Sequence, residues 1–228
     1  MSENQLMTDS ARIKEIFTSI QGEGPYIGVK QLFVRFCGCN LNCKYCDTKY
    51  DNENSRLYSI GELQSIIDNN LDCHSVSLTG GEPLLNIEFL KKFVPLCKLP
   101  IYLETNATLA DSLSEVIDNI DYISADIQIP SCTGGNPLWI EHSKFFNIAQ
   151  NKNLFAKVVF DENITDSEIA KSVELVDKYG IELVLQPKSS HKSVIVNMNF
   201  VESIFNKFLS QYTKVRLIPQ VHKFLNLR

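Results

Sequence analysis

Short β-rich runs alternate with helical patterns along most of the chain, and this alternation constrains the fold more than any other feature. The β-rich runs are Leu32–Cys37, Ser75–Thr79, Ile101–Glu104, Tyr122–Asp126, Phe155–Phe160, Glu182–Gln186 and Val215–Ile218. The helical patterns between and after them are Ile60–Asn69, Ile87–Leu96, Leu109–Ile117, Trp139–Asn151, Thr165–Tyr179 and Val196–Leu209. Such alternation predicts a parallel sheet with crossover helices.

The number and spacing of these elements narrow the fold class. About six strands are too few for a complete eight-stranded barrel, so we expect an α/β fold, a partial TIM-like barrel with flanking helices, whose active site lies at the carboxyl ends of the strands. Ser59 and Thr165 precede helical patterns, Glu168 completes a capping box with Thr165, and Gly180 is placed to end that helix. No repeat or flexible linker interrupts the pattern, so residues 1–228 are predicted to form a single domain.

Charge and hydropathy exclude several classes of function. The chain has 22 basic and 27 acidic residues, a net charge of −5, which argues against a general nucleic-acid-binding protein. No apolar run reaches the roughly 18 residues of a membrane span. The first residues are polar and lack the apolar core of a signal peptide. We therefore expect a cytoplasmic enzyme or binding protein with no membrane partner and no direct contact with nucleic acid.

Three of the seven cysteines, Cys39, Cys43 and Cys46, stand within eight residues in the sequence FCGCNLNCKYCDT, directly after the first β-rich run. In a reducing compartment, clustered cysteines are more often metal ligands than disulfides. Three thiolates from one loop suit a 4Fe-4S cluster and leave its fourth iron open, as a catalytic metal site requires.

The alternative is a zinc site or three unrelated thiols. Zinc usually needs a second close pair of Cys or His ligands, whereas Cys73, Cys97 and Cys132 are scattered along the chain. Cys37 is a possible fourth ligand. It shares a strand face with Arg35, however, and is better explained as a core thiol.

Two motifs carry a family resemblance. CNLNCKYCDT resembles the cluster loop of the radical S-adenosylmethionine (SAM) superfamily, and TGGEP, Thr79–Pro83, resembles the glycine motif of that superfamily. A narrower resemblance, from about Ile16 to the C-terminus, is to the 7-carboxy-7-deazaguanine synthase family. It rests on IFTSIQGEGPYIG, FVRFCGCN, CDT and the tail PQVHKFLNLR, and Gln21–Gly24 is its most specific part.

The resemblance implies a reaction, its cofactors and its partners. The enzyme would convert 6-carboxy-5,6,7,8-tetrahydropterin to 7-carboxy-7-deazaguanine with loss of ammonia, on the route to queuosine or archaeosine. It would use a 4Fe-4S cluster, S-adenosyl-L-methionine and Mg²⁺, and a 5′-deoxyadenosyl radical would abstract hydrogen from C6 of the substrate. An electron donor such as flavodoxin or ferredoxin and a homodimeric assembly are implied as well.

The resemblance also assigns the metal and cofactor contacts. Cys39, Cys43 and Cys46 would hold the cluster. Thr48 would bind magnesium, which prefers hard oxygen ligands, although a helix N-cap is the alternative for this threonine. The positions that match the family's cofactor contacts are Tyr45, Cys46, Asp47, Gly81, Glu104, Asn106, Ser124, Gln186 and Lys188. This chain departs from the family's frequent Ser-Pro-Lys by having Ser124-Ala125-Asp126, which replaces a cation by an anion.

The positions that match the family's substrate contacts are Ile20, Gln21, Gly22, Arg35, Thr79, His222 and Arg228. The Arg35 guanidinium is suited to the substrate carboxylate, because it can donate two parallel hydrogen bonds to one. Its alternative role is a salt bridge at the end of the barrel. His222 is either a tail residue that closes over the substrate or a surface histidine. The remaining histidines, His74, His142 and His191, are interpreted as incidental.

Two other functions stay open on the sequence. One is an activase for a glycyl-radical enzyme, which would share the cluster loop and TGGEP but would not need Gln21–Gly24 and Arg35. The other is a non-catalytic iron–sulfur or zinc protein, which the metal content of the protein distinguishes from an enzyme.

Overall fold

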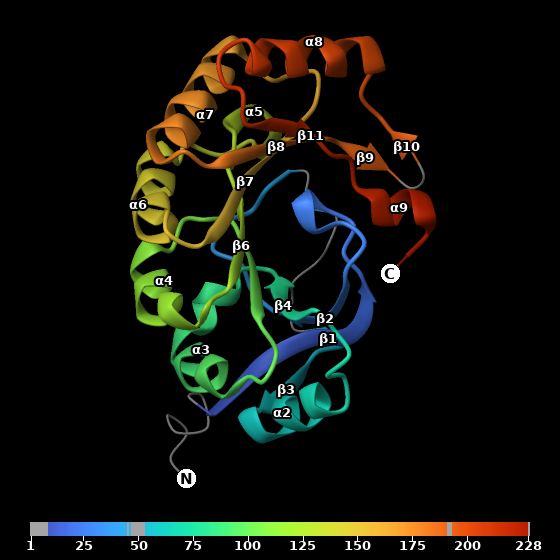
Figure 1. The fold of residues 1–228 in the computed structure, drawn as a ribbon, viewed down its shortest axis with the longest axis vertical. Helices are drawn as coiled ribbons and strands as arrows, with labels where there is room; N and C mark the ends of the chain where they lie inside the picture. The colour runs from blue at the N-terminus through green and yellow to red at the C-terminus, as the bar shows by residue number, and fades with distance from the viewer. Residues whose placement is uncertain (1–8, 45, 47–52, 191–192, 228) are drawn as a thin grey trace.

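The protein folds around a curved, mostly parallel sheet (Figure 1). The structure is a computed structural model that describes residues 9–44, 46, 53–190 and 193–227. Across the sheet, the strands follow the order β11 (Val215–Leu217), β8 (Glu182–Pro187), β7 (Asn153–Phe160), β6 (Tyr122–Asp126), β5 (Ile101–Thr105), β4 (Ser75–Gly80), β2 (Lys30–Phe36), β1 (Ser10–Ile20) and β3 (Arg56–Ser59).

Strand direction divides the sheet into two parts. Among the described residues, the seven strands from β2 to β11 pair in parallel, as the strand–helix alternation predicts. Strands β1 and β3 add an antiparallel edge that the sequence analysis did not predict. Strand β1 was missed because Lys14 and Glu15 interrupt its apolar pattern, so that its buried residues, such as Ile13, are widely spaced.

Helices cover the outer face of the sheet. They are α2 (Ile60–Asp68), α3 (Ile87–Phe93), α4 (Ala110–Val116), α6 (Trp139–Ala149), α7 (Asp166–Tyr179) and α8 (Met198–Leu209), with the shorter α5 (Pro130–Thr133) and α9 (Val221–Leu225). Figure 1 shows α3, α4, α6 and α7 in succession along the outside of the curved sheet. This arrangement is the partial barrel expected from the sequence. No helix in the described ranges is long and apolar enough to cross a membrane.

The helix boundaries follow from the capping residues. The Thr165 side chain accepts a hydrogen bond from the Glu168 N–H, and the Glu168 carboxylate accepts one from the Thr165 N–H, so the predicted capping box begins α7. Ser59 and Glu62 form the same arrangement at the start of α2. Helix α7 ends at Gly180, whose φ of 64° lies in the left-handed region that favours glycine.

Outward-facing side chains of the strands form the main core with the helices. Fully buried examples from β4, β5, β7 and β8, in that order, are Leu78, Leu103, Val158 and Leu183. Each such side chain contributes roughly 1.5–3 kcal/mol of stability by its removal from water. Because successive residues of a strand face opposite sides, the residues beside these four point into the barrel.

The inward-facing residues form a second, smaller cluster at the amino ends of the strands. Tyr102, Phe155 and Val184 make its buried centre. Tyr26 enters from the 3₁₀ turn η1 (Gly24–Tyr26), and its ring packs edge-on against the rings of Tyr102, at 5.7 Å, and Tyr122, at 4.8 Å. Aromatic residues therefore fill this end of the barrel. Two positions further along three of these strands, the inward side chains are Glu104, Lys157 and Gln186, all polar.

Candidate active site

A cavity of about 240 Å³ lies at the carboxyl ends of the parallel strands. Polar and ionisable residues make up most of its lining: Glu23, Cys39, Cys43, Cys46, Thr79, Glu104, Thr105, Asn106, Asp126, Gln128, Lys157, Gln186, Lys188, Ser189, Gln220 and Lys223. Nine of the lining residues are site residues predicted from the sequence: Cys39, Cys43, Cys46, Thr79, Gly81, Glu104, Asn106, Gln186 and Lys188. The strand ends thus bring together residues that lie up to 149 positions apart in the chain, from Cys39 to Lys188.

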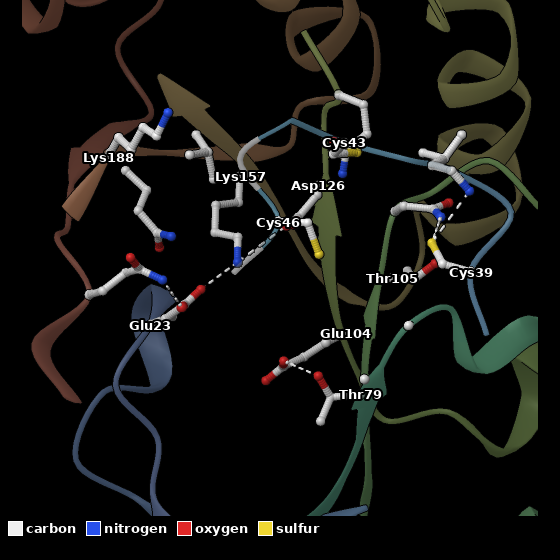
Figure 2. A pocket seen from close by; sticks show the side chains of 18 of the residues that line it. Glu23, Cys39, Cys43, Cys46, Thr79, Glu104, Thr105, Asp126, Lys157 and Lys188 are labelled. Carbon is white, nitrogen blue, oxygen red and sulfur yellow. Dashed lines mark hydrogen bonds and ion pairs between the residues drawn. The ribbon is translucent and has the colours of Figure 1, made fainter. Parts of the chain in front are cut away.

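The three predicted cluster ligands come from one loop at the rim of this cavity (Figure 2). None of the three is joined to another described cysteine by a disulfide. The Asn106 side-chain amide lies 3.8 Å from Cys39 Sγ, and Cys43 Sγ lies 3.6 Å from Gln128 Oε1. Burial raises the pKa of Cys39, and burial together with the two neighbouring thiols raises the pKa of Cys43 to about 11. A positively charged metal centre would therefore be needed to hold these thiols as thiolates.

The geometry of the thiols bears on which metal centre fits. Within the described part of the chain, no three Cys, His, Asp or Glu side chains converge as ligands of a single metal ion would. In a 4Fe-4S cluster each thiolate binds a different iron, so its ligands surround a larger body. Three separate thiols that face one cavity suit that arrangement.

The glycine motif at the end of β4 lies directly against the beginning of the cysteine loop. The Gly81 N–H donates to the Phe36 carbonyl at 3.0 Å, and the Glu82 N–H donates to the Gly38 carbonyl at 2.8 Å. A Cβ added at Gly81 would overlap the Gly38 carbonyl. Close packing of these two backbones therefore requires glycine at position 81, independently of any cofactor.

Glu82, the acidic residue of TGGEP, is fully buried behind the cavity. Its carboxylate accepts hydrogen bonds from the Thr105 hydroxyl at 2.9 Å, from the Asn106 N–H at 2.8 Å and from the Leu84 N–H at 3.1 Å. Burial raises the pKa of Glu82 to about 7, although these three donors oppose the shift. Glu82 therefore fixes the end of β5 and the loop that carries Asn106.

Glu104, a predicted cofactor contact, is hydrogen-bonded to two residues that were predicted to contact the substrate. Its carboxylate accepts hydrogen bonds from the Gln21 side chain at 2.9 Å, from Thr79 Oγ1 at 2.7 Å and from Ser77 Oγ at 3.2 Å. Figure 2 shows Glu104 and Thr79 side by side in the interior, away from Cys39 and Cys43. Glu104, expected at the cofactor, thus lies among the residues expected at the substrate. Gln21 is buried, and its amide also donates to the Gln31 side chain at 2.9 Å.

A buried cation that the sequence analysis did not identify lies opposite Glu104. Lys157 Nζ is 2.5 Å from Glu23 Oε2 and 3.3 Å from Asp126 Oδ1, and the Gln220 side chain donates to Glu23 Oε1 at 2.8 Å (Figure 2). Burial alone would raise the pKa of Glu23, but the Lys157 ammonium and these hydrogen bonds outweigh it and lower the pKa to about 2. For Asp126, burial outweighs the attraction of Lys157 and raises the pKa to about 6.

Lys157 also supplies a cation beside Asp126, the position where the family frequently has a lysine. Asp126 on β6 and Lys157 on β7 are register partners, so the cavity keeps a cation at this level although position 126 is acidic. The signal in the sequence was a lone lysine within the apolar run Phe155–Phe160. A lysine in a buried strand is rarely tolerated without a partner.

Gln186 has the clearest unused binding capacity in the cavity. It is nearly fully buried on β8, and its side-chain Oε1 accepts no hydrogen bond from any described residue. A buried amide oxygen without a donor is costly, so this atom is suited to a ligand N–H or O–H group. Lys188, two residues on, forms an ion pair with Asp161 at 3.5 Å.

Other predicted site residues lie beside the cavity. Ser124 is buried and is hydrogen-bonded to Tyr102 beneath the cavity floor. Arg35 forms an ion pair with Glu15 at 2.6 Å, and its guanidinium lies over the Phe17 ring. This is the salt bridge named above as the alternative for Arg35.

The tail packs against the QGEG segment. The Val221 N–H donates to the Gly22 carbonyl at 2.9 Å, and a Cβ at Gly22 would overlap His222, so α9 and Gly22 are in direct contact. Ile20, at the end of β1, is exposed. Tyr45, Asp47, Thr48 and Arg228, which were predicted to contact cofactor, magnesium or substrate, lie outside the described residues.

Comparisons with known proteins identify the family of this chain and agree with its fold. The family model described as the Radical SAM superfamily matches residues 33–183. The chain is 34% identical to 7-carboxy-7-deazaguanine synthase of Geobacter sulfurreducens, over 94% of this chain and 97% of that one. It is 36% identical to the protein of the same name from Archaeoglobus fulgidus, over 96% and 99% of the two chains. The crystal structure of QueE from Escherichia coli has the same fold, with a TM-score of 0.66 at 18% identity over 97% of this chain and all of that one.

Proposed function

We infer the function of this protein from one premise: the chain belongs to the 7-carboxy-7-deazaguanine synthase family of the radical SAM superfamily. It is a radical SAM enzyme of 7-deazapurine biosynthesis. Its reaction is the conversion of 6-carboxy-5,6,7,8-tetrahydropterin to 7-carboxy-7-deazaguanine with release of ammonia. The observation that carries this function is a single cavity that the three cysteines line together with Thr79 and Glu104. Gln21 is hydrogen-bonded to Glu104 behind this lining.

We propose that Cys39, Cys43 and Cys46 hold a 4Fe-4S cluster with one iron open to the cavity. When bound, the cluster supplies the electron that cleaves S-adenosyl-L-methionine reductively. Asn106 and Gln128, which contact the thiols of Cys39 and Cys43, would position the loop and donate or accept hydrogen bonds around the sulfur atoms. Such contacts tune an iron–sulfur centre.

For S-adenosyl-L-methionine, we propose a site between the cysteine loop and the ends of β5 and β8. The free Oε1 of Gln186 supports this assignment, because the cofactor's amino and hydroxyl groups are hydrogen-bond donors. Gly81, Asn106 and Lys188 line the same cavity, and Ser124 supports it from below. Tyr45, Cys46 and Asp47 are proposed to contact the cofactor from the cysteine loop.

For the pterin, we propose a site deeper in the barrel, around Gln21, Thr79 and Glu104. A carboxylate that is held by three donors is suited to accept further N–H groups from the amino-pyrimidinone edge of a pterin. We therefore assign Glu104 to the substrate, in place of the cofactor role first expected. Arg35 would bind the substrate carboxylate after exchanging its partner Glu15. Ile20, Gly22, His222 and Arg228 are proposed to complete the site from the QGEG segment and the tail.

We further propose that Thr48, two residues after Cys46 in the sequence, binds Mg²⁺ together with the substrate, because its hydroxyl is a hard oxygen ligand. Residues 1–228 are proposed to form one radical SAM domain, and two copies to form a homodimer. Flavodoxin or ferredoxin is proposed as the electron donor. A cytoplasmic location is proposed as well, because cysteines that form no disulfide are typical of a reducing compartment.

Anaerobic reconstitution with iron and sulfide, followed by assay with S-adenosyl-L-methionine, reductant and the carboxytetrahydropterin, tests this function. The expected product is 7-carboxy-7-deazaguanine, detected by mass spectrometry, and its yield is expected to fall when Mg²⁺ is chelated. Cleavage of S-adenosyl-L-methionine with no deazaguanine would favour a glycyl-radical activase. Zinc in place of about four irons per chain, with no cleavage, would favour a non-catalytic metal protein.

A further inference from the structure

His142, on helix α6 behind the sheet, is fully buried and has both ring nitrogens engaged. Its Nε2 accepts a hydrogen bond from the Gln128 N–H at 3.0 Å, and its Nδ1 lies 3.1 Å from the Ala107 carbonyl. A backbone N–H can only donate and a carbonyl can only accept, so the ring must be neutral with its proton on Nδ1. Burial lowers the pKa of His142 to about 4, which agrees with this state.

The two backbone groups that His142 binds belong to different loops of the cavity. Ala107 follows β5 and has a φ of 55°, a conformation that costs energy for a residue other than glycine. Gln128 follows β6. One side chain therefore ties together the loops after two neighbouring strands and holds one of them in a strained conformation.

Each of these loops also contacts a different cysteine of the cluster loop. Asn106, next to Ala107, contacts Cys39 Sγ at 3.8 Å and donates to Asn40 Oδ1 at 2.8 Å. The Gln128 side chain contacts Cys43 Sγ at 3.6 Å. On the other side of Asn106, Glu82 holds its N–H. The contacts thus run from α6, through two loops, to two of the three thiols.

We propose that His142 is a positioning residue for the cluster and cofactor site. It acts as a neutral clamp that keeps the Asn106 and Gln128 loops at a fixed separation and so sets the geometry around Cys39 and Cys43. This inference rests on the proposed function of the cavity. Without the clamp, the Gln128 N–H and the Ala107 carbonyl lose buried partners, and the strained turn at Ala107 is free to relax.

The test compares two conservative replacements of His142 with a matched control. His142→Phe keeps a ring of similar shape, which stacks near Phe146, but has neither polar nitrogen. His142→Gln has an amide oxygen for the Gln128 N–H and an amide N–H for the Ala107 carbonyl. His74→Phe is the control, because His74 packs against Tyr26 and Tyr122 at the opposite end of the barrel.

Each reconstituted protein is measured by electron paramagnetic resonance of the reduced cluster, with and without S-adenosyl-L-methionine, and by the dissociation constant for that cofactor. His142→Phe is expected to alter the spectrum and weaken cofactor binding about tenfold, and His142→Gln is expected to restore most of both. His74→Phe is expected to lower the melting temperature without changing either readout. Wild-type spectrum and affinity in His142→Phe would overturn the proposal.

Failure of the variant to fold and failure of the proposed function can each be distinguished from failure of this proposal. If His142→Phe does not fold, His142→Asn replaces it, because the shorter amide reaches the Ala107 carbonyl but not the Gln128 N–H. Its affinity is expected to be lower than that of His142→Gln, and equal affinity would overturn the proposal. If the wild-type protein binds neither cluster nor cofactor, the proposed function fails, and His142 loses its role with it.

Discussion

The two ends of the barrel interior are built from the same strands but differ in chemistry. At the amino ends, Tyr102, Phe155 and Tyr26 pack into an apolar cluster. At the carboxyl ends, two positions along the same strands, Glu104 and Lys157 face the cavity. Residues two positions apart on a strand face the same side of the sheet, so these side chains all point into the barrel. Their position along the strand decides whether they pack in the aromatic cluster or line the polar cavity.

This difference indicates that the aromatic end contributes mainly to stability and the polar end mainly to function. At the aromatic end, the side chains are fully packed by the protein itself, because the rings bury one another and Gly24 fits against Phe155. At the polar end, by contrast, Gln186 Oε1 lacks a donor among the described residues. A region that carries unsatisfied groups at a stability cost is the usual location of a binding site.

The largest expected effect comes from substituting a predicted cluster ligand at the rim of the polar end. Cys43→Ala should lose the cluster and reduce product formation to background, because two thiolates from this loop cannot replace three. Cys97→Ala, at a half-buried cysteine outside the cavity, should keep both iron content and activity. Iron per chain after anaerobic reconstitution measures the difference, and full iron content in Cys43→Ala would contradict the assignment.

The next effect concerns the buried cation. Lys157→Met should lower the free energy of unfolding by up to about 3–5 kcal/mol, because it leaves two partly buried carboxylates, Glu23 and Asp126, without their common partner. Lys188→Met is the control. Its ion pair with Asp161 is more exposed, and its loss should cost about 1 kcal/mol or less. Urea denaturation of the metal-free proteins at pH 7 distinguishes the two, and equal losses would show that Lys157 is not a key element of the polar end.

At the aromatic end, a pair of glycines tests how tightly the interior is closed. Gly24 and Gly28 both have positive φ, at 65° and 95°, but a Cβ would overlap the Phe155 ring at Gly24 and meet nothing within 4 Å at Gly28. Gly28→Ala should cost about 1–2 kcal/mol of stability from backbone strain alone. Gly24→Ala should cost about 1–3 kcal/mol more, because it overpacks the cluster.

Thermal or urea unfolding of the two alanine variants gives this comparison directly. If they are equally stable, the QGEG segment does not close the aromatic end as tightly as the contacts indicate.

The smallest effect is a pH dependence. The pKa of His142 in the folded protein, about 4, lies below its ordinary value of 6.5. As pH falls below 6.5, the unfolded chain therefore takes up a proton before the folded chain does, and stability that is present above pH 6.5 is lost toward pH 4. Between pH 6 and 5, the stability of the wild-type protein should fall more steeply than that of His142→Gln, by up to about 1.4 kcal/mol per pH unit. Parallel profiles would contradict a buried neutral histidine.

The sequence predicts some parts of this molecule well for physical reasons. Cys39, Cys43 and Cys46 lie within eight residues, so a short stretch of sequence is enough to predict the cluster loop. The parallel strands follow from apolar runs, and the capping box at Thr165 is contained within four residues. In each of these cases the interacting groups are close together in the chain.

The parts that the sequence could not predict depend on alignment between distant segments. The Lys157–Asp126 pair needs the register of β6 against β7, and its link to Glu23 needs a segment 134 residues earlier in the chain. His142 was interpreted as incidental because nothing near it in the sequence indicates that α6 reaches two loops of the site. The hydrogen bonds of Glu104 with Gln21 and Thr79 could not be predicted either, because they form only when three segments far apart in the chain meet.

The central claim is that the cysteine loop and the Glu104 network serve a single reaction at the polar end. The most direct measurement is deuterium transfer from carboxytetrahydropterin labelled at C6, under anaerobic conditions with S-adenosyl-L-methionine and reductant. We predict 7-carboxy-7-deazaguanine as product and deuterium in the 5′-deoxyadenosyl group of the recovered cofactor. Cleavage of the cofactor with unlabelled 5′-deoxyadenosine and no deazaguanine would contradict the claim.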